Sequence, residues 1–249
     1  MATKNILFLF GAAGAGKTTF ATNFKEKQSR MAVTLVNLDP VVRDRGQFDF
    51  DICDYVSVED VMDEFDYGPN GGLFESLRYL EEIFFPDETV DDESVPFLQP
   101  DSITIFDCPG QIELFLHSSI IPNFIKRFSS REDCSIAICY LTDGTTISSL
   151  NKFRFNLLIA LVSTNRFVFP MLNLITKTDL MDRSQRSVVW DETGSCVSVE
   201  LDSEGSQFDR RLNEFVELYG MSTFVPVDWE DDSCVEMVFE NVGRVLGLD

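Results

Sequence analysis

The chain has 249 residues, of which 44% are hydrophobic, and its 42 acidic and 20 basic residues give a formal net charge of −22 at pH 7. A chain of this length and hydrophobicity can build one α/β domain with a sizeable core. The negative charge repels nucleic-acid phosphates and anionic lipids, which argues against direct binding of nucleic acid or of a membrane.

The six cysteines form no CxxC pair, which argues against a zinc site and against a disulfide framework. They are expected to be reduced and mostly buried thiols. No apolar run has the length of a secretory signal or of a membrane span. We therefore expect a cytoplasmic protein, with shuttling to the nucleus left open.

Short β-rich apolar runs alternate with helical patterns along the chain. This alternation predicts an α/β fold with a doubly wound, mostly parallel sheet in a single domain over 1–249. The predicted strands are NILFLF, VTLVNL, SITIF, SIAICYL, PMLNLI and STFVPV. The predicted helices lie near 17–29, 57–65, 72–85, 112–128, 147–163, 208–219 and 232–246. The acidic stretches 86–94 and 190–206 are expected to be solvated surface loops.

The first strand runs directly into GAAGAGKT, which matches the G-x-x-x-x-G-K-[ST] phosphate loop in its strand–loop–helix setting. Its glycines let backbone N–H groups turn toward phosphates, and the start of the helix adds positive partial charge. Lys17 is expected to reach the β- and γ-phosphates, Thr18 to bind Mg²⁺ and Thr19 to contact the α-phosphate. The predicted phosphate-binding residues are Gly11, Gly14, Ala15, Gly16, Lys17, Thr18 and Thr19.

A second motif, DCPGQIE, ends the third predicted strand, where open α/β sheets place their ligands. Asp107 is expected to hold Mg²⁺ through a water, and Gly110 to present its N–H to the γ-phosphate. Gln111 and Glu113 follow within reach of an attacking water. Asp39, in NLDP after the second strand, is a further candidate metal-side residue, with a simple Asp-Pro turn as the alternative.

The segment TKTDL follows the fifth predicted strand and indicates which base is bound. Asp179 can accept from the N1–H and N2 amine of guanine, a donor pair that adenine lacks, and the stem of Lys177 can pack under the base. Thr176 stands where the commonest version of this motif has an asparagine, which normally braces the loop and contacts the base edge, so this position weakens the guanine motif. Asp228, in PVDW after the last strand, is another candidate base-site residue. Guanine is favoured over adenine.

These motifs together resemble the GPN-loop GTPases, a branch of the P-loop GTPases related to dimeric nucleotide-switch ATPases. The resemblance rests on GAAGAGKTT, NLDP, VEDVMDEFDYGPNGGL, DCPGQIEL and TKTDL, in the family's order and approximate spacing, and it covers nearly the whole chain. It implies a single P-loop GTPase domain with a GPN-loop and dimerisation insertion at about 55–95. It also implies the second or third eukaryotic paralogue type.

In this family the Gly-Pro-Asn tip inserts into the nucleotide site of the partner subunit, which the resemblance implies for Gly68, Pro69 and Asn70. Pro69 fixes one φ angle and the glycines permit tight reversals, so a polar amide can be held on a rigid tip. Asn70 is then expected to donate to a γ-phosphate or a released phosphate. The candidate catalytic residues are therefore Asn70, Asp107, Gln111 and Glu113.

The resemblance implies a dimeric switch that binds GTP and GDP with Mg²⁺ and hydrolyses GTP. It further implies a homodimer, or a heterodimer with another GPN-loop GTPase, that assists RNA polymerase II assembly and nuclear import by acting on polymerase subunits or assembly factors. The alternative is a nucleotide-stabilised assembly partner with little hydrolysis of its own. A MinD-like ATPase is less favoured, because those proteins carry a second lysine early in the loop where this chain has Ala12.

Overall fold

The computed structural model describes residues 3–41, 47–85, 97–111, 114, 118–130, 133–190, 211 and 224–248. In these residues a seven-stranded, fully parallel sheet has the order β3-β2-β4-β1-β5-β6-β7. The strands are β1 (Lys4–Gly11), β2 (Ala32–Asn37), β3 (Phe50–Asp51), β4 (Ser102–Asp107), β5 (Cys134–Asp143), β6 (Met171–Thr176) and β7 (Phe224–Pro226).

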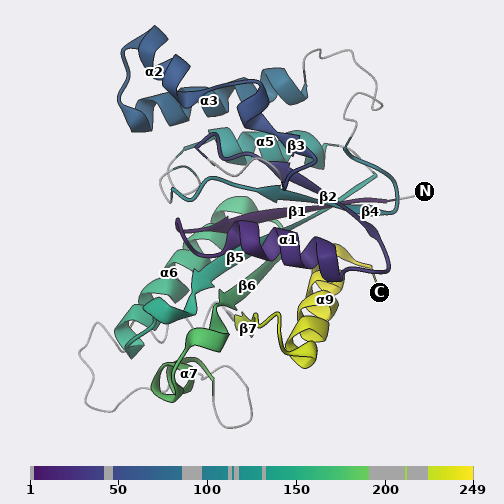
Figure 1. Cartoon of the computed structure of the whole chain (residues 1–249), viewed down its shortest axis with the longest axis vertical. Helices are drawn as coiled ribbons and strands as arrows, with labels where there is room; N and C mark the ends of the chain where they lie inside the picture. Colours follow the sequence, from purple (N-terminus) through teal and green to yellow (C-terminus); the bar gives the residue numbers. More distant parts are fainter. Residues whose placement is uncertain are drawn as a thin grey trace.

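Helices cover both faces of the sheet. The α-helices are α1 (Lys17–Lys27), α2 (Val58–Phe65), α3 (Pro69–Phe84), α5 (Ile120–Ser129), α6 (Leu150–Phe167), α7 (Arg183–Val189) and α9 (Asp232–Leu246). Short 3₁₀ helices are η1 (Ile52–Asp54), η3 (Gly144–Thr146) and η4 (Thr178–Leu180). Figure 1 shows α2 and α3 together at the top of the view and α7 at the bottom.

The central strand β1 shows why the chain folds into three layers. Ile6, Phe8 and Phe10 point into a core shared with α3, α5 and α6, whereas Leu7 and Leu9 point into a core shared with α1 and α9. All five side chains are at most 1% exposed. A strand buried on both faces is continuously apolar rather than alternating. The predicted doubly wound parallel sheet is therefore confirmed.

Phenylalanine rings join helix α3 to α5 and to strand β4, where the Phe84 ring lies 6.2 Å from the Phe106 ring. Phe8 of β1 stacks on Phe106 of β4 at a centroid distance of 4.7 Å, and Phe84 of α3 meets Phe124 of α5 edge-on at 5.2 Å. Between α2 and α3, a Cβ on Gly72 would lie 2.4 Å from Cγ of Met62, so glycine permits the close approach of α3 to α2.

Several predicted boundaries are wrong. The helix expected over 112–128 is interrupted, because Ser118 and Ser119 are not helical and α5 begins at Ile120, whose N–H donates to the Ser118 hydroxyl at 3.1 Å. Strand β3 and helix α7 were not predicted. Three predicted segments lie outside the described residues: 86–94, nearly all of 190–206, and the helix 208–219 except for Arg211.

Among the residues that the structure describes, no helix has both the length and the apolar character needed to span a membrane.

Candidate functional site

The phosphate-loop motif leaves the carboxyl end of β1, between β4 and β5 at the centre of the sheet. This is the point where parallel α/β sheets open a crevice for ligands. Gly14 and Gly16 have positive φ angles of 77° and 84°, in the left-handed region that favours glycine. A Cβ on Gly11 would lie 2.4 Å from the carbonyl oxygen of Leu141. The predicted strand–loop–helix geometry is therefore present.

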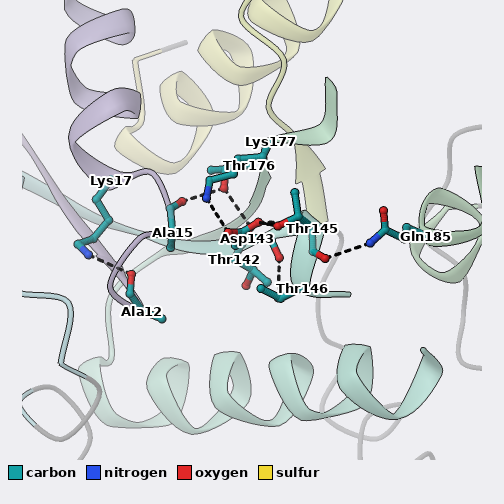
Figure 2. A network of polar contacts seen from close by, with 10 residues as sticks. All are labelled: Ala12, Ala15, Lys17, Thr142, Asp143, Thr145, Thr146, Thr176, Lys177 and Gln185. Atoms are coloured by element: carbon teal, nitrogen blue, oxygen red, sulfur yellow. Dashed lines mark hydrogen bonds and ion pairs between the residues drawn. The ribbon is translucent and has the colours of Figure 1, made fainter. Parts of the chain in front are cut away.

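The side chain of Lys17 lies over this loop. Its Nζ donates to the carbonyl oxygens of Gly11 at 3.1 Å and Ala12 at 3.3 Å, and the residue is only 8% exposed. Figure 2 shows the contact with Ala12. Both acceptors are neutral. Phosphate oxygens would offer the buried ammonium charged acceptors, which form roughly twice as strong hydrogen bonds. The lysine is thus already placed where an anion can bind.

The Thr18 hydroxyl meets the carboxylate of Asp107 at the end of β4. The hydroxyl donates to Oδ2 at 2.5 Å, and Asp107 is 2% exposed. Burial raises the pKa of Asp107 to about 6, although the hydrogen bond from Thr18 and the charge of Lys17 both act to lower it. The charge of Asp39 raises it further, which places a second carboxylate near the first. Burial and a nearby second carboxylate both disfavour the ionised form of Asp107, and a bound cation would stabilise that form.

Mg²⁺ fits this donor set. Thr18, Asp107 and Asp39 offer oxygen ligands only, and the Asp39 carboxylate is oriented by accepting the N–H of Val41 at 3.1 Å. The described residues contain no group of three or more His, Cys, Asp or Glu side chains that could hold a metal by themselves. Mg²⁺ typically takes one or two carboxylates and completes its shell with water and substrate phosphates. These residues would therefore hold Mg²⁺ together with a nucleotide.

The segment after β4 packs directly on the phosphate loop. A Cβ on Gly110 would lie 2.8 Å from both the backbone N and Cα of Ala13, so only glycine allows this approach. Gln111 follows and is half-buried, whereas Glu113 lies outside the described residues. Gly110, the predicted γ-phosphate contact, therefore lies directly against the phosphate loop.

A pocket of about 270 Å³ opens on the other side of the loop. Gly16 and Thr19 line one wall, and Lys177 and Asp179 line another. A third wall comes from the segment after β7, where Trp229 also contacts Phe20 of α1 at a ring distance of 5.4 Å. The predicted base-site residues therefore meet in one cavity beside the phosphate loop.

Thr176 braces the phosphate loop, the role that asparagine has in the commoner motif. Its hydroxyl donates to the Ala15 carbonyl at 2.8 Å and lies 3.2 Å from the Thr142 carbonyl (Figure 2). Two positions later, the Thr178 hydroxyl donates to the Val227 carbonyl at 2.9 Å. The carboxyl end of β6 is thereby tied to the phosphate loop and to the segment after β7, which form the other two walls of the pocket.

A family model described as "Conserved hypothetical ATP binding protein" matches residues 9–247. GPN-loop GTPase 3 of Candida glabrata is 28% identical over 251 residues, which cover 96% of this chain and 90% of that protein. GPN-loop GTPase 3 of Saccharomyces cerevisiae is also 28% identical, over 96% of this chain and 91% of its own length. The chain belongs to the GPN-loop GTPase family. The resemblance inferred from its motifs is confirmed.

The fold of this GPN-loop protein agrees with a solved structure. The apo form of a GTPase from Pyrococcus abyssi is 23% identical, with a TM-score of 0.76 and coverage of 98% of both chains. At this identity the comparison supports the arrangement of helices and strands, not the chemistry. This agreement in the arrangement of helices and strands confirms the predicted P-loop α/β fold.

The GPN tip itself differs from the expected loop in front of a helix. Helix α3 begins at Pro69, not near residue 72, and the Gly72 N–H donates to the Gly68 carbonyl at 2.9 Å. Proline suits the first helical position because its φ is preset and its missing N–H has no helical partner there. Gly68, Pro69 and Asn70 are all exposed. The tip therefore presents Asn70 from a rigid first turn of helix.

Sequence reasoning missed three residues near the base pocket. Trp229 lines the pocket, Asp143 pairs with Lys177, and Gln185 of the unpredicted helix α7 bonds the Asp143 segment. A signal for Asp143 was available, since it ends β5 as Asp107 ends β4. Nothing local in the sequence indicates that Gln185 contacts the Thr145 carbonyl.

Proposed function

We propose that this GPN-loop protein binds guanine nucleotides with Mg²⁺ and hydrolyses GTP as a dimeric switch. The observation that carries the proposal is the contact of Thr18 with Asp107 across the phosphate loop. This contact joins the hydroxyl at the end of the phosphate-loop motif to the acidic residue at the end of β4. P-loop nucleotide hydrolases use this arrangement to hold Mg²⁺. The names of the relatives support GTP as the substrate.

The phosphates and the base of the nucleotide each have candidate binding residues in the described part of the chain. The loop from Gly11 to Thr18 takes the phosphates, with the Lys17 ammonium on the β- and γ-phosphates. When bound, Mg²⁺ neutralises charge on the phosphate oxygens. Asp179 is exposed at the pocket and accepts the two donors of guanine, while Lys177 packs beneath the base.

Hydrolysis requires a positioned water and a donor to the transferred phosphate. Gln111 follows Gly110 at the phosphate loop and orients the water, and Glu113 is a second candidate for this role. Asn70 supplies a donor from the partner subunit, because its exposed tip is free to enter a second site. Phe65 and Tyr67 beside the tip are 39% and 45% exposed, which supports contact with another protein.

The proposed dimer is either a homodimer or a heterodimer with another GPN-loop GTPase. Its proposed task is to assist the assembly and nuclear import of RNA polymerase II, in the cytoplasm and with passage to the nucleus. This finer part rests on the resemblance of the motifs to the family. A nucleotide-stabilised assembly partner with little hydrolysis is the competing function.

Calorimetric binding of GDP and ADP with Mg²⁺, followed by phosphate release from GTP, tests the proposal. We expect GDP to bind about 5- to 150-fold more tightly than ADP, because adenine leaves the Asp179 carboxylate without its donor pair, at a cost of about 1–3 kcal/mol. Asp179→Asn should lose this preference. Asp232→Asn, which removes an exposed carboxylate on α9, serves as control.

The outcomes separate the candidate functions. Equal affinity for GDP and ADP in the unmodified chain would overturn the guanine assignment. Tight GDP binding without phosphate release, alone or with another GPN-loop GTPase, would favour the assembly partner over the hydrolase.

A further inference from the structure

An ion pair joins the base-binding segment to the end of the neighbouring strand. Nζ of Lys177 lies 2.6 Å from Oδ2 of Asp143, the last residue of β5. The other carboxylate oxygen, Oδ1, accepts the backbone N–H of Thr145 at 2.9 Å and its hydroxyl at 2.7 Å. Figure 2 shows Asp143 between Lys177 and Thr145. One oxygen thus fixes the carboxylate to its own turn, and the other holds the lysine.

Lys177 needs such a restraint because of its backbone. Its φ of 57° and ψ of 35° are left-handed, a conformation that is unfavourable for a residue other than glycine. Thr176 before it and Thr178 after it are each tied by a hydroxyl to another segment. The ion pair adds the third restraint, on the side chain that lines the pocket.

The partner of Lys177 is itself held in place. Gly144 packs so closely that a Cβ there would lie 2.5 Å from Sδ of Met181 and 2.9 Å from the Thr176 carbonyl oxygen. From α7, Nε2 of Gln185 donates to the Thr145 carbonyl at 3.0 Å. The turn that carries Asp143 is therefore fixed from two sides.

The same helix also holds the other end of the base segment, where an Arg186 guanidinium nitrogen donates to the Thr178 carbonyl at 2.6 Å. Helix α7 thus contacts both the Asp143 turn and the TKTDL segment. Two segments 34 positions apart in sequence are fixed against each other around one ion pair.

We propose that Asp143 is a positioning residue for nucleotide binding, which holds Lys177 so that its stem forms a preset floor for the base. This inference rests on the proposed guanine-nucleotide function and deepens it. Asp143 does not touch the nucleotide in this assignment, because its two oxygens are used by Thr145 and Lys177.

The charge state of Asp143 suits this role. Burial alone would raise its pKa, but the hydrogen bonds from Lys177 and Thr145 outweigh burial and hold the pKa below the usual value. The carboxylate is therefore ionised at neutral pH. A preset lysine lowers the conformational entropy lost on binding, which favours affinity rather than the chemical step.

The test compares Asp143→Asn, Lys177→Met and the double variant, by calorimetry with GDP and with a non-hydrolysable GTP analogue. Lys177→Met keeps the apolar stem and removes only the ammonium. Asp133→Asn is the matched control, because Asp133 pairs with Lys4 at 2.9 Å beside the opposite end of the same strand, away from the pocket.

We expect either single variant to weaken GDP and the GTP analogue equally, by about three- to tenfold, since the Lys177 side chain is 36% exposed and solvent screens the pair. The double variant should be no weaker than the single ones. In steady-state GTP turnover the KM should rise while kcat stays within about twofold. Asp133→Asn should bind like the unmodified chain.

Three results would overturn the inference: unchanged affinity in Asp143→Asn, an equal loss in Asp133→Asn, or a multiplied loss in the double variant. If Asp143→Asn melts well below Asp133→Asn, Lys177→Met decides alone, because it leaves the Asp143–Thr145 bonds intact. Unchanged GDP affinity in Lys177→Met would then reject the inference. Failure of the unmodified chain to bind GDP would instead reject the proposed function and this inference together.

Discussion

Replacing Asp107 by asparagine should stabilise the nucleotide-free protein while damaging its function. Asp107 is 2% exposed, and burial raises its pKa from the usual 3.8 to about 6. Asparagine has nearly the same shape and keeps an oxygen that can accept the Thr18 hydroxyl, but it carries no charge to desolvate. The substitution therefore removes a cost that the folded protein pays only without a bound cation.

The size and sign of the effect follow from the pKa. Because the folded pKa is raised, the folded state holds its proton more tightly than the unfolded state, and its stability falls as pH rises from about 4 to about 6. The difference between pKa values of 3.8 and about 6 corresponds to a stability penalty of about 3 kcal/mol, fully present above pH 6. The penalty is about half as large near pH 5 and vanishes below about pH 4.

Thermal unfolding of the nucleotide-free protein between about pH 5 and pH 8 measures this penalty. At about pH 7.5, Asp107→Asn should melt up to about 6–12 °C above the unmodified chain, at about 2–4 °C per kcal/mol for a domain of this size. The difference should narrow toward pH 5. Asp133→Asn is a control of opposite sign, because the hydrogen bond from Lys4 lowers the pKa of Asp133.

The reasoning would be refuted if Asp107→Asn were the less stable protein at neutral pH, or if its advantage were the same at pH 5 and pH 8. A second comparison uses Mg²⁺ with the non-hydrolysable GTP analogue. These should raise the melting temperature of the unmodified chain by more than that of Asp107→Asn, because a ligand stabilises only the state it binds.

Three further predictions address the loop, its brace and the tip. Lys17→Ala should remove most GTP affinity and less of the GDP affinity in calorimetry, because we propose that its ammonium contacts the β- and γ-phosphates; unchanged GTP binding would place the nucleotide elsewhere. Thr176→Val should weaken GDP and GTP alike by about three- to tenfold, because the Ala15 carbonyl loses its donor; a loss for GTP alone would contradict this role. Asn70→Ala should keep nucleotide affinity within a few-fold but slow turnover, and mixing it with Lys17→Ala should restore one competent site per mixed dimer. Strictly additive activities in the mixture, after native mass has shown mixed dimers, would reject a shared site.

The layered fold could be predicted because local sequence determines it. Central strands such as β1 are buried on both faces, and this shows as an unbroken apolar run. Strand β3 has two residues, too few for any periodic pattern. Helix α7 has seven, and its clearest signal, the capping box of Asp182 and Gln185, was not recognised.

The candidate site could be predicted only where a motif is contiguous. GAAGAGKT and DCPGQIE each name their own residues, and their meeting follows from the order of parallel strands. Side-chain pairs between distant segments left no such pattern. The Thr176 hydroxyl donates to the carbonyl oxygen of Ala15, 161 positions earlier, and nothing near Thr176 in the sequence indicates this contact. The replacement of the usual asparagine by threonine therefore suggested a weaker motif, although the threonine still braces the loop.

In the proposed dimer, the position of the tip separates nucleotide binding from turnover. The loop around Lys17, the carboxylate of Asp107 and the pocket of Asp179 all lie on one chain, so one chain has what binding requires. Asn70 instead lies exposed at the start of α3, whose other end is anchored on α5 through Phe84. In the proposed dimer, this donor completes a site only when a second chain approaches. Nucleotide affinity should then be independent of protein concentration, whereas turnover per chain should rise as dimers form.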